Sequence, residues 1–96
     1  MFLEIATLEV RPGHEDEFAH SMAGAVPLIR RARGCHQVEL LRSVEHPTRF
    51  RMLIRWESIE DHLAFREHPD AIVFGDIQKH HVKDKNSDHS VWIHPC

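Results

Sequence analysis

The chain has 96 residues, 42% hydrophobic and 28% charged, which is the composition of one soluble globular domain over residues 1–96. Its net charge of −3 with neutral histidines leaves no basic surplus for binding nucleic acid or an anionic membrane. There is no apolar run near the roughly 20 residues of a membrane span, no signal-peptide pattern and only two cysteines, so a reducing cytoplasm is the expected location.

The first half of the chain predicts a strand, a helix and a second strand. Residues 2–10 mix β-branched and apolar side chains with two glutamates, and an Arg-Pro-Gly sequence ends this strand. Over residues 14–32, apolar side chains recur at spacings of four, three and four, as on one face of a helix. Pro27 is expected to kink this helix, and Gly34 is expected to stop it. Residues 35–44 predict the second strand.

Residues 49–56 are the clearest strand of the sequence. Its side chains alternate between two faces, one apolar and one rich in arginine. The apolar face carries Phe50, Met52, Ile54 and Trp56. The other face carries Leu53 among the arginines.

The last third of the chain predicts two helices and a strand. Ser58 begins a helix, with Asp61 three residues later as a capping partner. A proline ends this helix and suits the first turn of a third one, over residues 69–82. Residues 83–88 are predicted as a polar loop and residues 89–94 as the final strand.

The order of these elements predicts an α+β domain with a ferredoxin-like, four-stranded antiparallel sheet and helices on one face. The opposite face stays uncovered and carries Leu53 between Arg51 and Arg55. A half-apolar bare face on a small domain usually contacts a partner. A second copy, giving a homodimer through the open sheet face, is the simplest expectation.

Four segments resemble one known family when they are taken together. They read "VRPGHEDEF" from residue 10, "VPLIRRARGCH" from residue 26, "LLRSVEHPTRF" from residue 40 and "WES" from residue 56. The set is similar to the antibiotic biosynthesis monooxygenase family, which includes quinol monooxygenases. The resemblance implies a dimeric α+β barrel with a pocket between sheet and helices. It also implies a cofactor-independent monooxygenase that oxidises a small electron-rich aromatic or quinol substrate with molecular oxygen.

The haem-degrading branch of the family has three residues that this chain lacks. Its asparagine on the first strand is replaced at Ala6, and its helix tryptophan is replaced by Phe65. Its histidine ligand has no aligned counterpart, because His80 and His81 come too late. We therefore expect no haem, and no metal or flavin cofactor. The aromatic-polyketide branch carries an asparagine where this chain has Met52.

Aromatic and apolar side chains are the expected walls of the pocket. Trp56 can be a core residue only, or a flat wall for a planar substrate. The resemblance favours the wall, because a tryptophan at this position lines the pocket in oxygenase members. The predicted substrate-binding residues are Trp56, Phe50, Met52, Phe65 and Phe74.

Three polar side chains are the catalytic candidates. His62 and His81 fall within the apolar stripes of their helices at 100° per residue, where each is either a base or a histidine satisfied by a backbone carbonyl. Arg66 shares the stripe of His62 and can either snorkel to solvent or hold an anion. Asp76 and His80 lie four residues apart, but a second ligand pair at a matching spacing is missing, so no zinc site is expected.

Oxygenation without a cofactor needs a dry flat pocket, a base with a pKa near neutrality and a donor for the developing oxyanion. Two other functions fit the same fold. One is a dimeric binding module that holds a small aromatic or lipid-like molecule and catalyses nothing. The other is a cofactor-free isomerase or lyase.

Overall fold

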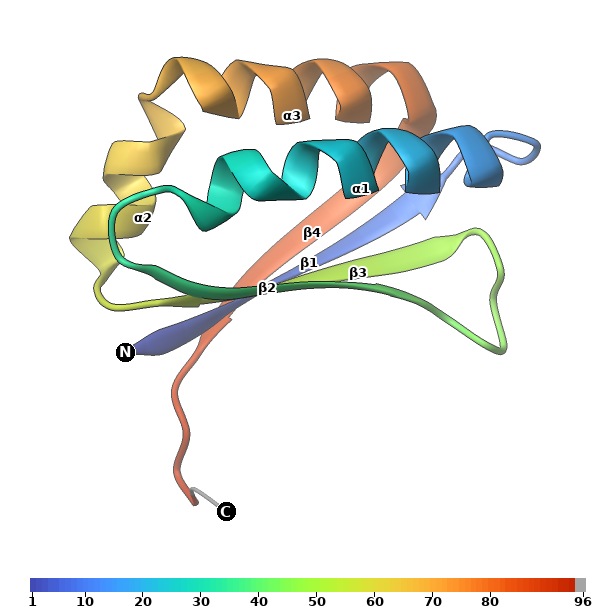
Figure 1. Ribbon diagram of the computed structural model, residues 1–96. Helices are drawn as coiled ribbons and strands as arrows, with labels where there is room; N and C mark the ends of the chain where they lie inside the picture. Colours follow the sequence, from blue (N-terminus) through green and yellow to red (C-terminus); the bar gives the residue numbers. More distant parts are fainter. Residues whose placement is uncertain (95–96) are drawn as a thin grey trace.

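The computed structural model describes residues 1–94, and its order of elements is the predicted one (Figure 1). In chain order the elements are β1 (Phe2–Val10), α1 (Glu15–Arg30), β2 (Cys35–Arg42), β3 (Arg49–Trp56), α2 (Ile59–Arg66), α3 (Pro69–His81) and β4 (Val82–Ser90).

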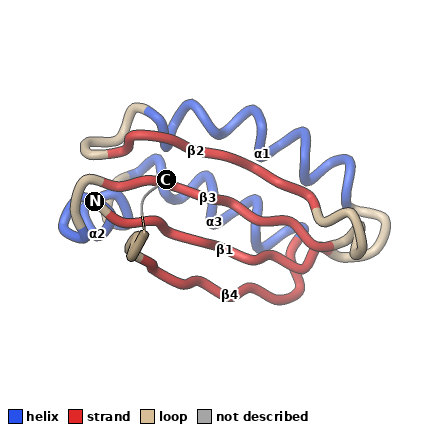
Figure 2. Tube along the Cα trace, turned by 90° about the horizontal axis from the view of Figure 1, so that it is seen from below, coloured by secondary structure: helices blue, strands red, loops and turns tan. Residues whose placement is uncertain are grey.

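The strands form one antiparallel sheet in the order β2-β3-β1-β4. All helices of the described chain lie over the same face of the sheet (Figure 1). The view from below shows the opposite face without helices over it (Figure 2). β1 is central, and its Leu3 pairs with Arg55 of β3 on one side and with Ser90 of β4 on the other. The predicted ferredoxin-like arrangement is confirmed.

The core between sheet and helices follows the predicted periodicities. The buried face of α1 consists of Phe18, Met22, Ala25 and Ile29. The buried face of β3 consists of Phe50, Met52, Ile54 and Trp56. β1 alternates strictly, and its buried positions are Phe2, Glu4, Ala6, Leu8 and Val10. A glutamate therefore occupies one of the core positions of the central strand.

The ends of the helices show how local chemistry shapes the chain. α1 continues past Pro27 and ends at Arg30, slightly before the predicted end. Gly34 has a φ of +82°, and a Cβ there would lie 2.1 Å from Oδ2 of Asp61, so glycine is needed where the chain turns towards β2. The Ser58 hydroxyl caps α2 as predicted, accepting a hydrogen bond from the backbone N–H of Asp61 at 3.2 Å.

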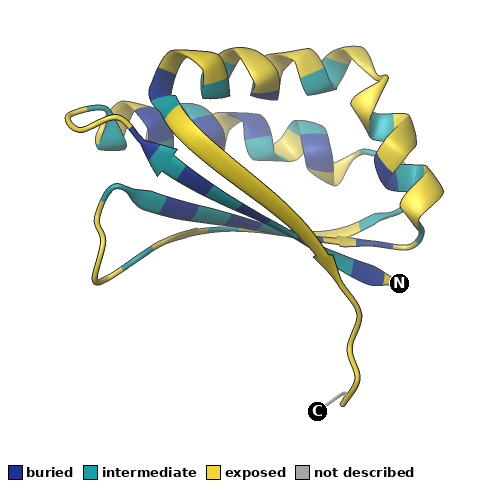
Figure 3. Ribbon diagram, turned by 180° about the vertical axis from the view of Figure 1, so that it is seen from behind, coloured by how far each residue is buried: buried dark blue, intermediate teal, exposed yellow. Residues whose placement is uncertain are grey.

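The C-terminal strand is where the sequence-based prediction is wrong. Residues 83–88, predicted as a loop, lie inside β4, whereas residues 91–94 of the predicted strand lie outside it. Eight of the nine positions of β4 are exposed, as the yellow strand in Figure 3 shows. Its composition is poor for a strand, but the edge of β1 supplies a ladder of backbone hydrogen bonds, and this tertiary context overrides propensity. The charged side chains also suit an edge strand.

The helix-free face of the sheet is partly apolar. Leu53 is half-buried there, and the guanidinium of Arg55 lies 5.0 Å from the ring centre of Trp92, which follows β4. Val91 and Ile93 are 68% and 97% exposed. Within residues 1–94, no helix has the length and apolar character needed to cross a membrane.

Candidate active site

A cavity of about 380 Å³ lies between the sheet and the helices. Its volume falls within the range typical of small-molecule sites. Most of the predicted site residues line it, namely Met52, Trp56, His62, Phe65, Arg66 and Phe74. Glu4, Lys85 and Ser87 also line it.

Trp56, His62 and Glu4 form a contiguous buried group in the wall of this cavity. Trp56 is fully buried, and its ring stacks on the imidazole of His62 with ring centres 5.3 Å apart and planes at 17°. The indole Nε1–H of Trp56 donates a hydrogen bond to Oε1 of Glu4 at 2.9 Å. Nε2 of His62 lies 3.2 Å from the same carboxyl oxygen. Trp56 is thus a core residue and a wall of the cavity at once.

The second ring nitrogen of His62 contacts another histidine. Nδ1 of His62 lies 3.2 Å from Nε2 of His89 in β4. The ring of Phe2 packs near both imidazoles, at 6.1 Å from His62 and 5.3 Å from His89. The partners of His62 are therefore side chains, and not the backbone carbonyl that the sequence left as an alternative.

The surroundings of His62 favour its neutral form. Burial is the main cause that lowers its pKa below the ordinary value near 6.5, and the charges of His89 and Arg66 act in the same direction. The charge of Glu4 opposes this effect but does not reverse it. A neutral imidazole carries one hydrogen, either on Nε2 facing Glu4 or on Nδ1 facing His89. With the hydrogen on Nδ1, Nε2 is an unprotonated acceptor directed at Glu4.

The family model of the antibiotic biosynthesis monooxygenases matches residues 1–75. The chain belongs to the antibiotic biosynthesis monooxygenase family. The match ends within α3, so that β4, with His89, lies beyond the matched residues.

Related proteins support this family and its fold. A crystal structure from Bordetella bronchiseptica, whose name places it in the same family, is 35% identical, with a TM-score of 0.84 over 96% of both chains. A Nitrosomonas europaea structure, similarly named, is 17% identical and shares the fold, with a TM-score of 0.87 over 98% of this chain and all of that one. The uncharacterized protein YczJ of Bacillus subtilis is 32% identical over 62 residues, and this match spans 65% of each chain.

Glu4 lines the cavity of this family member but was not among the predicted site residues. A signal for it was present, because Glu4 shares the alternating register of the apolar residues of β1 and is the acid among them. Lys85 and Ser87 were missed for another reason, since both lie in the segment predicted as a loop. His89 had been placed on the last strand, but no spacing in the sequence shows that it meets His62.

Two predicted site residues lie elsewhere in this member of the family. Phe50 packs edge to face on Phe18, with ring centres 5.0 Å apart, and does not line the cavity. His81 is buried near the start of α1, where its Nδ1 lies 3.0 Å from Nδ1 of His14. Of the two candidate histidines, the structure therefore brings only His62 to the cavity.

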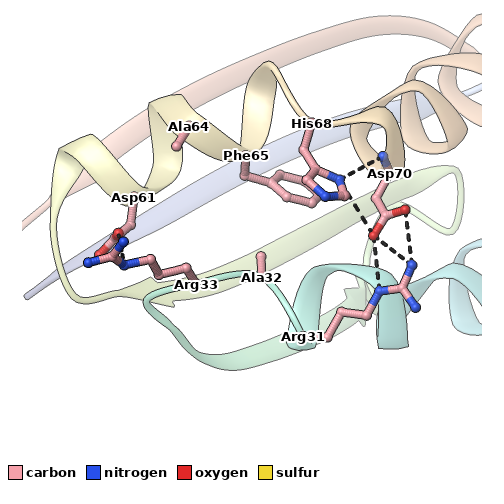
Figure 4. Close-up of a pocket in the computed structure, with 8 residues that line it drawn as sticks. All are labelled: Arg31, Ala32, Arg33, Asp61, Ala64, Phe65, His68 and Asp70. Atoms are coloured by element: carbon pink, nitrogen blue, oxygen red, sulfur yellow. Dashed lines mark hydrogen bonds and ion pairs between the residues drawn. The ribbon is translucent and has the colours of Figure 1, made fainter.

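A second hollow, of about 420 Å³, lies between the end of α1 and the helices α2 and α3 (Figure 4). Arg31 donates hydrogen bonds to both carboxyl oxygens of Asp70, at 2.9–3.1 Å. Nδ1 of His68 accepts from the backbone N–H of Asp70 at 3.0 Å. These groups satisfy one another at the surface, whereas the first cavity contains a buried carboxyl and imidazole beside aromatic walls. The first cavity is therefore the stronger candidate.

Proposed function

We propose that this protein is a cofactor-independent monooxygenase that oxidises a small electron-rich aromatic or quinol in the cavity between sheet and helices. One observation carries the proposal: the buried Glu4–His62 pair lies in the cavity wall, against the flat ring of Trp56. A planar phenolic ring can stack in such an apolar space while its acidic hydrogen faces the pair.

Within this proposal, Glu4 and His62 act as one base. The indole of Trp56 and the imidazole of His62 both contact Oε1 of Glu4, which among the described residues leaves Oε2 to face a ligand. Both nitrogens of His62 already have partners, so Oε2 of Glu4 takes the proton from the substrate. The carboxyl group can pass a proton on to Nε2 of His62 when the hydrogen of the neutral imidazole is on Nδ1, facing His89. The low pKa of His62 keeps this acceptor unprotonated at neutral pH.

The reaction balances without an added reductant. The base removes a proton from the substrate, and the resulting anion transfers one electron to dioxygen. The carbon radical and superoxide combine to form a C–O bond, and the peroxide is protonated. Removal of the second hydrogen on that carbon breaks the O–O bond, leaving a carbonyl and one water. A methylene plus O₂ thus gives a carbonyl plus H₂O, and a quinol plus O₂ gives a hydroxyquinone plus H₂O.

Two cationic side chains would stabilise the negative charge that develops on the substrate oxygen. Arg66 from α2 and Lys85 from β4 both line the cavity. Lys85 also donates a hydrogen bond to Gln78 at 3.1 Å, which holds the ammonium group near the cavity. Fixed positive charge at this position lowers the barrier to anion formation.

The proposed activity is tested by oxygen uptake with a panel of hydroquinones and anthrones. Monooxygenation should consume O₂ in proportion to substrate, place one ¹⁸O atom from ¹⁸O₂ in the product, and be insensitive to catalase. Autoxidation makes hydrogen peroxide instead, and catalase then returns part of the oxygen. Saturable ligand binding without oxygen uptake would favour the binding module. Conversion of a substrate in the absence of O₂, with hydrogen from the solvent incorporated into the product, would favour an isomerase or lyase.

We also propose that the protein is a homodimer built through the helix-free face of the sheet. Leu53 on this face and the apolar residues after β4, such as Ile93, are incompletely covered in one chain. Covering them with a second copy removes apolar surface from water. Sedimentation at micromolar concentration should give twice the chain mass of 11.2 kDa. A folded species of single-chain mass would contradict the dimer.

A further inference from the structure

A second cluster of histidines lies away from the cavity, where the start of α1 meets the end of α3. Gly13, at a φ of +91°, ends the Arg-Pro-Gly turn and brings His14 to the N-terminus of α1. The backbone N–H of Arg11 donates to the carbonyl of His81 at 2.8 Å, which ties this turn to the last turn of α3. None of the residues of this cluster lines the cavity.

The ligating atoms of the cluster are close together. One ligand atom from each of Glu17, His80 and His81 lies within 4.8 Å of the other two. Nδ1 of His14 lies 3.0 Å from Nδ1 of His81. The His81 ring is buried, whereas Glu17 and His80 are exposed. His14 makes no side-chain capping bond to its own helix.

Two sets of distances approach those around a single metal ion, one among Glu17, His80 and His81 and the other between His14 and His81. Zinc binds histidine nitrogen at about 2.0–2.1 Å in a tetrahedron, so two ligands on one ion lie roughly 3.3 Å apart. The His14–His81 separation is already near this value, and the exposed Glu17 and His80 can close the remaining gap.

We propose that His14, Glu17, His80 and His81 form a binding site for a divalent transition ion of the zinc type. Three imidazoles and one carboxylate are a donor set that zinc accepts, and four protein ligands leave no open position, as in a structural site. The bound ion would fasten the start of α1 to the end of α3. No spacing in the sequence indicates this site, because its ligands come from the start of α1 and the end of α3, more than sixty residues apart.

The test is zinc binding by chelator-treated protein, measured by titration calorimetry with ZnCl₂. One equivalent per chain should bind tightly. His80→Ala and Glu17→Gln alter exposed side chains, so both variants should fold, and each should bind zinc at least about tenfold more weakly. His46→Ala is the matched control, because His46 is an exposed histidine in the turn between β2 and β3. It should bind zinc like the unmodified protein.

Thermal unfolding gives a second readout, since an ion that binds only the folded chain raises its melting temperature. Excess zinc should raise the melting temperature of the unmodified protein and of His46→Ala. The rise should be much smaller for His80→Ala. Equal zinc affinity in His80→Ala, Glu17→Gln and the unmodified protein would overturn the proposal. Absence of saturable binding at tens of micromolar zinc would also overturn it.

Discussion

His62→Gln is expected to lower turnover of a quinol or anthrone at least about tenfold, within the range of roughly 10²–10⁴ that general-base assistance supplies. Glutamine keeps a hydrogen-bonding group near Glu4 but cannot accept a proton near neutral pH. The variant should still fold, dimerise and bind the aromatic ligand, so the loss should appear in kcat and not in KM. Steady-state oxygen uptake measures both constants.

The pH profile of the unmodified protein should identify the same group. In the proposed reaction His62 accepts a proton in its neutral form, and its pKa is lowered. The rate should therefore rise with pH below about 6.5 and be level at neutrality. A rate that still rises steeply between pH 7 and 8 would contradict this assignment.

A surface pair offers the control for His62→Gln. Nε2 of His36 lies 2.8 Å from Oε2 of Glu57, the same chemical pairing as in the cavity, but exposed to solvent. His36→Gln should leave turnover unchanged. If His62→Gln also leaves turnover unchanged, the imidazole is not needed as a base, and Glu4 alone would have to accept the proton.

Trp56→Ala is expected to destabilise the fold by on the order of 3–5 kcal/mol, because it empties a fully buried aromatic site. It also removes the indole donor from the buried carboxyl of Glu4. Urea unfolding followed by circular dichroism should show the loss as a lower midpoint. A free energy of unfolding within about 1 kcal/mol of that of the unmodified protein would contradict the tight packing of Trp56.

Trp56→Phe separates the structural role from the binding role. Phenylalanine refills most of the space, so the remaining loss is mainly that of the hydrogen bond to Glu4, about 1–3 kcal/mol for a buried group. If Trp56 is a wall for substrate, this folded variant should bind aromatic ligands with altered affinity. Trp92→Phe is the control, because Trp92 is 41% exposed and lies outside the cavity. Unaltered ligand affinity in Trp56→Phe would restrict Trp56 to packing.

Periodicity predicted the elements that bury apolar side chains. The apolar faces of α1 and β3 contain the buried residues that their spacings indicated. In α2, His62 is buried as expected, whereas the apolar side chains of Ile59 and Leu63 in the same helix are 52% and 49% exposed. A helix of only two turns reaches the core with few side chains, so the direction of its buried face depends on how α2 docks beside β3.

The candidate site was predictable only in part, for a physical reason. Trp56 and His62 lie on elements with a clear apolar face, and the sequence placed both near one pocket. Their partners Glu4 and His89 lie on the two neighbouring strands β1 and β4. The pairing of those strands depends on backbone hydrogen bonds between segments about eighty residues apart, and such pairing has no signature in side-chain spacing.

The polar character of β4 also bears on how a ligand enters the cavity. This strand is anchored by its ladder to β1 and buries little side-chain surface, so its detachment costs less than unfolding of the core strands. Lys85 lines the cavity, and His89 contacts the buried imidazole. Detachment of β4 would therefore widen the cavity and, at the same time, separate the proposed base His62 from His89. The widened cavity and the contact between His62 and His89 would then exclude each other, and the return of β4 over a bound anion would restore that contact.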